Sequence, residues 1–178
     1  MFNKSRFVKQ ELVKKRGLLY QLAYSWCHEP ALADDLVQEA MVKALRNTRQ
    51  LQDINAVKPW LTRILSNCWY DYLRSRRDIT DIDSLPYEAL PRTADTNERQ
   101  DIVDRVRQMI EKLPIGQRQV ITLVDLAGFS YAEIAETLDI PIGTVMSRIC
   151  RARKALKVSL AEYDPRHEYA RAKIRSVK

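Results

Sequence analysis

Apolar residues recur at intervals of three and four along most of the N-terminal part of the chain, a spacing typical of helices with one buried face. They form three runs, at residues 18–26, 36–45 and 61–72. Pro30 and Pro59 stand before the second and third runs, where proline suits the first turn of a helix. The pattern predicts three helices, the third ending near residue 76, and a polar loop over residues 47–56. We expect the second helix to bury Leu36, Val37, Ala40, Met41, Ala44 and Leu45.

The C-terminal part shows the same spacing, and its last two predicted helices are short and close together. Apolar stripes at residues 102–113 and 120–126 predict the helices that precede them. Ser130 is a good N-cap and Glu133 follows three residues later, the pattern of a capping box, while Pro141 suits the start of the next helix. Two short helices joined by a tight turn predict a helix-turn-helix, a motif of DNA-reading proteins. The apolar face of the last helix consists of Val145, Ile149, Ala152 and Leu156.

The opposite face of that last helix is polar and basic. From residue 142 to residue 160 there are five basic residues and no acidic one. Arg can donate to guanine edges, and Lys, Ser and Thr can donate to phosphates. A basic helix that is merely solvated would carry the same charge, but the cap, the turn and the apolar register together favour DNA reading. The residues on this face are Thr144, Ser147, Cys150, Arg151 and Lys154, with Arg148 on its flank.

The predicted third helix also has two different faces. Its polar face combines aromatic, basic and amide side chains, namely Trp60, Arg63, Asn67, Tyr70 and Arg74. Aromatic rings stack on unpaired bases, Arg binds phosphate and Asn can read a base edge. We expect Trp60 and Trp69 to complete a small core, and Arg63, Asn67 and Arg74 to contact nucleic acid. A solvated helix end is the alternative interpretation of the basic residues near residue 76.

Charge and composition indicate a polyanionic partner and a division into two domains. The 178 residues carry a formal net charge of +7. Residues 78–104, by contrast, hold eight acids and two arginines. With only four glycines and no strand pattern, the predicted fold is all-α: two small helical domains joined by a flexible acidic linker, the second containing the helix-turn-helix. The predicted ranges are 1–77 for the first domain, 78–97 for the linker, 98–163 for the second domain and 164–178 for a basic tail.

The sequence offers no pattern for catalysis or metal binding. It has two histidines and three widely spaced cysteines, with no phosphate-cradling glycine loop and no nucleophile elbow. Cys27 beside His28 would be half a metal site, but the sequence contains no second pair. We therefore expect no metal, no cofactor and no small-molecule substrate, and a protein that is not an enzyme. The charged N-terminus and the lack of a long apolar run predict a cytoplasmic location.

The two predicted modules resemble the extracytoplasmic-function (ECF) sigma factors, the minimal group of the bacterial sigma-70 family, over roughly residues 7–163. The family's helix that docks on the clamp of RNA polymerase is similar to ADDLVQEAMVKAL at 33–45. Its helix that recognises the promoter's minus-10 element is similar to PWLTRILSNCWYDYLRSRR at 59–77. Its domain that reads the minus-35 element is similar to residues 113–156. The order and spacing of the three segments make the resemblance specific.

The resemblance implies roles for individual residues. Polymerase docking falls to Asp34, Asp35, Gln38 and Glu39, although helix-dipole and solubility effects would also account for these acids. The resemblance assigns capture of an unpaired minus-10 base to Gln50, Leu51 and Gln52, with Asn67 beneath them. It also implies that Arg63 and Arg74 bind the minus-10 DNA. Contacts to the minus-35 duplex fall to Thr144, Ser147, Arg148, Arg151 and Lys154. The implied partners are promoter DNA, the clamp and flap of core RNA polymerase, and an anti-sigma factor.

Two other classes of protein share some of these features. An ordinary helix-turn-helix regulator would bind duplex DNA as a dimer without polymerase, but it leaves the mixed face at residues 60–74 unexplained. A nucleic-acid-modifying enzyme would need catalytic or metal-ligand patterns that the sequence lacks. The sequence therefore favours a transcription initiation factor.

Overall fold

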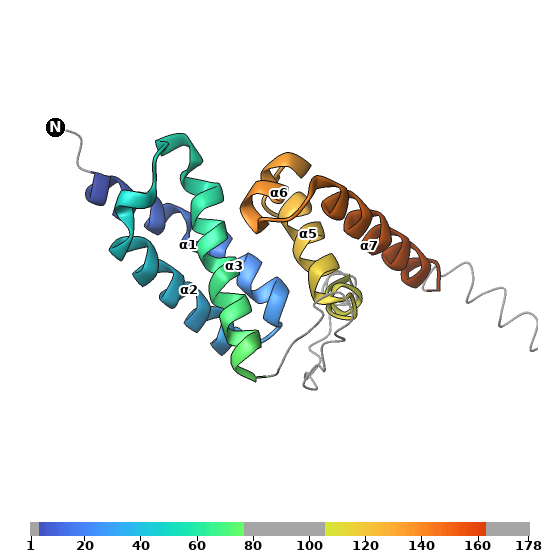
Figure 1. Ribbon diagram of the computed structural model, residues 1–178. Helices are drawn as coiled ribbons and strands as arrows, with labels where there is room; N and C mark the ends of the chain where they lie inside the picture. The colour runs from blue at the N-terminus through green and yellow to red at the C-terminus, as the bar shows by residue number, and fades with distance from the viewer. Residues whose placement is uncertain (1–3, 77–105, 163–178) are drawn as a thin grey trace, which may run out of the picture.

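The computed structural model describes residues 4–76 and 106–162, and within these two ranges the chain is helical with no strand (Figure 1). This confirms the predicted all-α fold. The linker predicted at 78–97, the tail predicted at 164–178 and the first part of the apolar stripe at 102–113 lie outside the described residues. The helices are α1 (Lys4–Cys27), α2 (Pro30–Arg46), α3 (Val57–Arg76), α5 (Ile115–Asp125), α6 (Tyr131–Leu138) and α7 (Ile142–Glu162), with short 3-10 turns at Thr48–Gln50 and Ile54–Ala56.

Helices α1, α2 and α3 pack side by side as a first module (Figure 1). Helix α1 begins well before the predicted run at residues 18–26, because Val8 and Leu12 continue its buried stripe. Pro30 opens α2 as expected, and Pro59 lies in the first turn of α3. The central side chains of this module are fully buried, among them Leu22, Trp26, Leu36, Leu65 and Trp69.

The prediction that α2 buries Leu45 was wrong. Leu45 is 37% exposed, whereas its neighbour Ala44 is completely buried. Adjacent residues on a helix point about 100° apart, so only one of the two can face the core that α1 and α3 form. Met41 is half-buried and packs against the edge of that core.

Helices α5, α6 and α7 form a second module around Val120, Ile134 and Val145. Gly128 ends α5 in a left-handed conformation, with φ of 64°. Its N–H donates to Val124 O (3.0 Å), the single bond of the αL C-cap motif, and the next N–H, of Phe129, donates to Leu123 O (3.1 Å). The apolar stripe at 120–126 predicted that Leu126 belongs to the buried face of this helix. Helix α5 instead ends at Asp125, where the chain turns, and Leu126 is 49% exposed.

Helices α6 and α7 form the predicted helix-turn-helix. The capping box is present: Glu133 N–H donates to Ser130 Oγ (3.2 Å), and Ser130 N–H donates to Glu133 Oε2 (2.7 Å). Asp139 adopts the left-handed conformation that turns the chain after α6, a role that Asp tolerates better than most residues. Pro141 O then accepts the first backbone hydrogen bonds of α7, from Thr144 and Val145. No described helix is long and apolar enough to cross a lipid bilayer.

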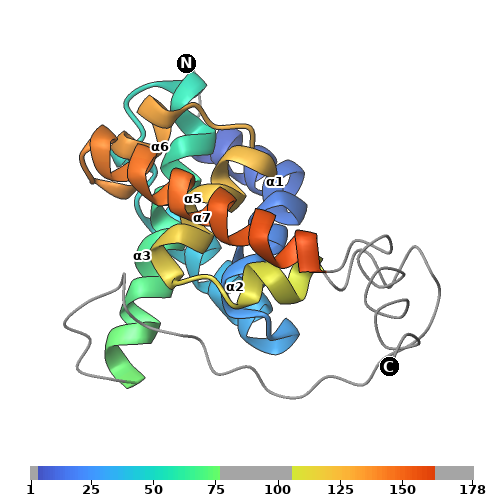
Figure 2. The ribbon, with the colours of Figure 1, turned by 90° about the vertical axis from the view of Figure 1, so that its right-hand side faces the viewer.

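The two modules pack directly against each other. Helix α5 contacts α1, and α6 contacts α3, and in the view of Figure 2 the second module lies in front of the first. Buried apolar side chains from both modules belong to one continuous cluster. Arg118 of α5 is 1% exposed and donates to Trp26 O of α1 (2.6 Å) as well as to Leu113 O (3.0 Å). A buried guanidinium therefore joins the end of α1 to the start of the second module.

Candidate nucleic-acid interface

The polar face of α7 is open to solvent. Ser147, Arg151 and Lys154 are exposed, Thr144 is half-buried, and Arg148 is half-buried on the flank. The opposite face, with Val145, Ile149 and Ala152, is buried as predicted, and Leu156 packs at its edge. Because the apolar residues fix the rotation of α7 about its axis, its basic residues project outward from the module.

Arg151 and Ser147 are linked within this face. Arg151 Nη2 lies 3.2 Å from Ser147 Oγ, and Arg151 Nε donates to Ser147 O at 3.3 Å. Ser147 Oγ donates in turn to Thr144 O at 3.0 Å. These bonds hold the guanidinium along the helix surface one turn from its own Cα. Ser147 and Arg151 thus form a compact pair of donors on the exposed face of the second helix of the helix-turn-helix, the helix that enters the major groove in DNA-reading proteins with this motif.

The capping box supports this face by fixing the start of α6. The backbone and hydroxyl of Ser130 donate to Glu133 and hold the pKa of the Glu133 carboxyl below its usual value. On α7, Arg153 Nη1 lies 3.5 Å from Tyr131 Oη and so links α7 to the first turn of α6. Arg153 therefore points toward α6, and Arg151 lies on the solvent-exposed face beside Ser147.

A cavity of about 570 Å³ lies between the loop after α2 and the start of α3. Such a volume falls within the range of about 300–1,000 Å³ found for sites that hold small organic groups. It brings together most of the residues expected to capture a base, including Gln50, Gln52 and Arg63. The full lining is Gln50, Leu51, Gln52, Asp53, Ala56, Pro59, Trp60, Arg63, Glu136 and Thr137.

Two members of this lining differ from what the sequence suggested. Leu51 lines the cavity although its side chain is almost completely buried. Trp60 was expected to complete the core; it does pack against the core, but unlike the fully buried Trp69 it is half-buried and also forms part of the cavity wall. Its helical spacing of three from Arg63 was the signal that could have placed it there, because residues three apart share a helix face.

The other minus-10 candidates lie further along α3. Asn67 is exposed, but it is not part of the cavity lining, so the loop and Asn67 do not enclose one common space. Arg74 is exposed and forms an ion pair with Asp71 (2.6 Å). The Arg74 guanidinium is the main reason why the pKa of the Asp71 carboxyl lies below its usual value.

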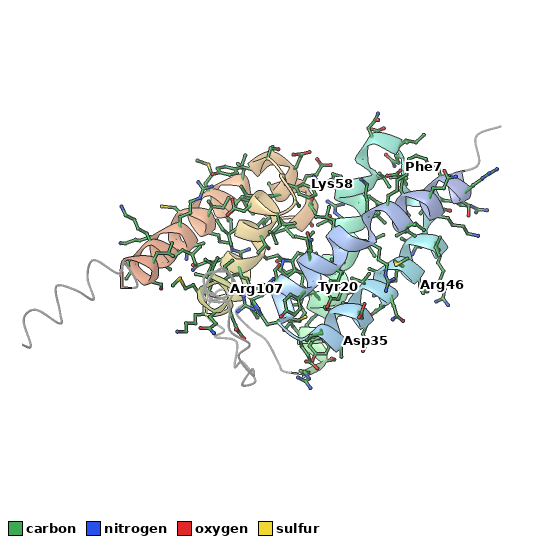
Figure 3. All side chains as sticks on the ribbon, turned by 180° about the vertical axis from the view of Figure 1, so that it is seen from behind. Phe7, Tyr20, Asp35, Arg46, Lys58 and Arg107 are labelled. Carbon is green, nitrogen blue, oxygen red and sulfur yellow. The ribbon has the colours of Figure 1, made fainter. Side chains whose placement is uncertain are left out.

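The expected polymerase-docking residues lie on the exposed side of α2. Asp35, Gln38 and Glu39 are exposed, whereas Asp34 is half-buried and lies 3.6 Å from Arg16 of α1. Figure 3 shows Asp35 on this outer side of the first module, away from the second. The same surface has an apolar part that its hydrophobic pattern did not predict, which consists of Val42 (45% exposed) and Leu45. We call Asp35, Gln38, Glu39, Val42 and Leu45 the α2 surface.

Lys43 joins this surface to α3. Its Nζ lies 2.8 Å from Glu39 and 3.2 Å from Asp71. Hydrogen bonding to Glu39, and then to Asp71, raises the pKa of Lys43 above its usual value. The ammonium therefore stays charged and holds α2 and α3 in register at their exposed edge.

The cysteines and His28 show no arrangement suited to metal binding. Within residues 4–76 and 106–162 there is no group of three or more His, Cys, Asp or Glu side chains that could hold a metal ion. Cys27 and Cys68 are buried, and burial raises the pKa of each thiol to about 11. Cys150 is exposed on α7. Burial, together with the positive charge of Arg118, lowers the pKa of His28 to about 3.

Comparison with known proteins places both modules in one family. The family models named Sigma-70 region 2 and Sigma-70, region 4 match residues 12–79 and 104–156. The ECF RNA polymerase sigma factor SigE of Mycolicibacterium smegmatis is 34% identical over 161 residues, which cover 86% of this chain and 62% of that protein. The RNA polymerase sigma-H factor of Pseudomonas aeruginosa is 33% identical over 161 residues, which cover 84% of this chain and 83% of that protein.

A solved structure shows the same relationship in three dimensions. The sigma factor RpoE of Bartonella quintana, solved in complex with the anti-sigma factor NepR, matches with a TM-score of 0.70 at 31% identity, covering 88% of this chain and 98% of that one. The chain therefore belongs to the sigma-70 family, whose members are transcription initiation factors rather than enzymes. Within that family it is an ECF RNA polymerase sigma factor.

Proposed function

We propose that this protein reads the minus-35 element of its promoters with the exposed face of α7. The observation that carries this proposal is the exposed, hydrogen-bonded pair of Ser147 and Arg151 on the second helix of the helix-turn-helix. A bidentate Arg discriminates between base pairs by about 1–3 kcal/mol, while Lys and hydroxyl contacts to phosphate position the helix. Arg151 is the base-reading residue, and Lys154 and Arg148 are the phosphate-contacting residues.

The first module would open and hold the minus-10 element. The cavity beside Gln50, Leu51 and Gln52 would receive an unpaired base, with Arg63 near its phosphate and Trp60 available for stacking. Asn67 and Arg74 lie further along the exposed part of α3 and would contact the strand that leaves the cavity. Residues 1–77 and 98–163 would act as the two DNA-reading domains, joined by a linker over 78–97.

The α2 surface would dock on core RNA polymerase. It presents two exposed apolar side chains, Val42 and Leu45, beside Asp35, Gln38 and Glu39. An apolar centre with a charged rim is the usual composition of a protein–protein interface. Asp34 would contribute less, because it is half-buried and paired with Arg16.

Control by an anti-sigma factor is part of the proposal. The sigma factor RpoE of Bartonella quintana was solved with the anti-sigma factor NepR, and the structurally similar CnrH was solved with the cytosolic domain of CnrY. An equivalent partner would hold this protein inactive until a signal releases it. Since it acts on RNA polymerase and promoter DNA, its place of action would be the cytoplasm.

In vitro transcription with bacterial core RNA polymerase tests the proposed function. Core enzyme, with and without this protein, is supplied with fragments of the source genome, and the 5′ ends of new transcripts are mapped. Discrete start sites that require the protein, with shared sequences near minus 10 and minus 35, are expected. Tight binding to duplex DNA without binding to core enzyme and without initiation would instead indicate a conventional helix-turn-helix regulator.

A further inference from the structure

The exposed surface of α7 carries a row of apolar side chains beside the polar residues that the proposed function assigns to the minus-35 element. Ile142 is 50% exposed and Met146 is 54% exposed, and Cys150 is also exposed. A free Cys behaves as a small apolar group. Residues four apart on a helix are neighbours on one face, so the three side chains form one row along the first turns of α7. We call Ile142, Met146 and Cys150 the apolar ridge.

The apolar ridge is distinct from the side of α7 that builds the core. Val145, Ile149 and Ala152 are buried in the core cluster, whereas Ile142 and Met146 belong neither to that cluster nor to the half-buried side chains packed against it. In Figures 1 and 2, α7 lies on the side of the second module that faces away from the first module. Core packing therefore does not explain why these two positions are apolar.

A second row of residues runs beside the apolar ridge on α7. It consists of Gly143, Ser147 and Arg151, which are also four apart and are all exposed. Arg151 Nη2 lies 3.2 Å from Ser147 Oγ. A helix with its side chains is about 10–12 Å across and the major groove of DNA is about 12 Å wide, so a helix that enters the groove presents both rows to the bases.

The major groove offers one apolar group that fits the apolar ridge. This group is the C5-methyl of thymine, and the other groups on the base edges there are hydrogen-bond donors and acceptors. Met146 lies within the first two turns of α7, and the N-terminal residues of a recognition helix are those that contact base edges. Its unbranched, flexible side chain adapts well to a small apolar surface.

The surroundings of the apolar ridge favour DNA over an apolar protein surface as its partner. Single exposed apolar side chains are common on proteins, and Val158 of the same helix, 56% exposed, is one of them. The apolar ridge instead combines three such residues beside a row of donors. From residue 142 to residue 160 there are five basic residues and no acidic one, which complements the phosphates on both sides of a groove.

We propose that Met146, with Ile142 and Cys150 beside it, packs against a thymine C5-methyl group in the major groove of the minus-35 element. The protein then selects an A·T pair at a position other than the one that Arg151 reads. This inference rests on the proposed function, because it takes the role of α7 from there. The methyl contact and the Arg151 contact involve different base pairs, so each can be removed without the other.

Removing one methyl group from the DNA tests the contact without changing base pairing. In a duplex that carries a minus-35 element from a mapped start site, each thymidine is replaced in turn by deoxyuridine, which lacks only the C5-methyl. Competition binding to the full chain measures the affinity. One replacement should weaken wild-type binding by roughly fourfold, the effect of one buried methyl group. Equal affinity for every replaced duplex would overturn the proposal.

Variants at Met146 show whether this side chain makes the methyl contact. Met146→Ala should bind the unmodified duplex more weakly by a similar factor, and should bind the thymidine and deoxyuridine duplexes equally at the sensitive position. Met146→Gln, which has a similar length but a polar end, should also lose the discrimination, while Met146→Leu should keep part of it. Wild-type discrimination in Met146→Ala would overturn the proposal.

Val158→Ala is the matched control, because Val158 is an exposed apolar residue about three turns further along α7. It should keep wild-type affinity and wild-type discrimination. Since Met146 is exposed and Ala favours helices, circular dichroism of Met146→Ala should match wild type. If that variant nevertheless unfolds, the comparison of Met146→Gln with Met146→Leu decides the outcome.

A protein partner on the apolar ridge would give a different result. Met146→Ala would then weaken binding to purified core RNA polymerase and leave the affinity for both kinds of duplex unchanged. This outcome would overturn the proposal, because the apolar ridge would serve the polymerase and not the DNA.

Failure of this inference differs from failure of the proposed function. Weaker duplex binding by Arg151→Ala, with no effect of any deoxyuridine replacement, would reject the methyl contact and leave minus-35 reading by α7 standing. Absence of binding to any minus-35 duplex, by the full chain alone and together with core enzyme, would reject the proposed function itself.

Discussion

The indole of Trp26 donates a 2.9 Å hydrogen bond to the hydroxyl of Thr122, which lies 96 residues later in the chain. Thr122 Oγ1 also lies 2.9 Å from Arg118 O, and Arg118 Nη1 donates back to Trp26 O at 2.6 Å. All three side chains are buried. The end of α1 and the helix α5 are therefore joined by a closed ring of hydrogen bonds, which links the stability of one module to the position of the other.

Replacing Thr122 by Val should destabilise the protein. Val has nearly the same shape but offers no acceptor, so Trp26 Nε1 would remain buried without a partner at a cost of about 1–3 kcal/mol in the free energy of unfolding. Thr122→Ser keeps the hydroxyl and should lose less. Urea denaturation followed by circular dichroism measures both variants, and a loss in Ser as large as in Val would show that the methyl group contributes as much as the hydrogen bond.

His28 should make stability depend on pH. It is buried near Arg118 and Arg107, and its pKa is lowered to about 3, whereas an unfolded His titrates near 6.5. Between these values the unfolded chain binds a proton that the folded chain does not, so the His28 contribution falls as the pH decreases from about 6.5 toward 3 and is constant above about 7. At pH 5 the loss is about 2 kcal/mol relative to pH 7.5.

The variant His28→Asn tests this pH dependence. His28 has a φ of 55°, a left-handed conformation that Asn tolerates, so the substitution avoids added backbone strain. The difference in unfolding free energy between wild type and variant should shrink or reverse in favour of the variant from pH 7.5 to pH 5. A difference that is independent of pH over this range would contradict the assigned cause.

The local helix signals could be predicted from the sequence, because short-range rules determine them. The capping box at Ser130 and Glu133, the proline starts at Pro30 and Pro59 and the buried stripe of α7 depend on neighbours within one or two turns. The roles of Trp60 and Leu45 could not be predicted in the same way, since both depend on which neighbouring helix covers which side. The packing of α6 on Arg63 was equally invisible, because it joins residues more than 70 positions apart through backbone carbonyls that any sequence supplies.

Removing the N-cap of α6 should weaken the second module. Ser130→Ala leaves the Glu133 N–H without its side-chain acceptor and should reduce the unfolding free energy by about 1 kcal/mol. Ser130→Asp preserves a capping oxygen and is the control, although it places a second carboxylate beside Glu133. Thermal denaturation compares them, and an Ala variant as stable as wild type would mean that water replaces the cap at no cost.

Arg151 and Arg153 provide a matched pair on α7. Both are exposed, but Arg151 lies with Ser147 on the proposed DNA face, whereas Arg153 contacts Tyr131 of α6. Arg151→Ala should weaken binding of the minus-35 duplex by about 1–3 kcal/mol and relax base preference at one position. Arg153→Ala should weaken binding less and leave the preference intact. Competition binding with singly substituted duplexes measures this, and equal effects of the two variants would reduce the role of Arg151 to charge alone.

Asn67 should act in strand opening rather than in duplex binding. It is exposed on α3 outside the cavity lining, on the side along which a captured strand would leave. Asn67→Ala should therefore slow formation of open complexes on linear duplex promoters, because contacts to unpaired bases are made only after opening begins. Permanganate reactivity of unpaired thymines in complexes with holoenzyme follows the opening.

The same variant can be rescued if this assignment is right. A promoter with a pre-opened minus-10 bubble no longer requires strand separation, so Asn67→Ala should approach wild-type transcription on it while remaining impaired on the duplex. Ser75→Ala is the control, because Ser75 is an exposed residue of α3 two turns after Asn67. Lys43 is unsuitable as a control, because it bridges Glu39 and Asp71. An Asn67 defect of equal size on duplex and bubble templates would place its role in binding the strand or the polymerase instead of in opening.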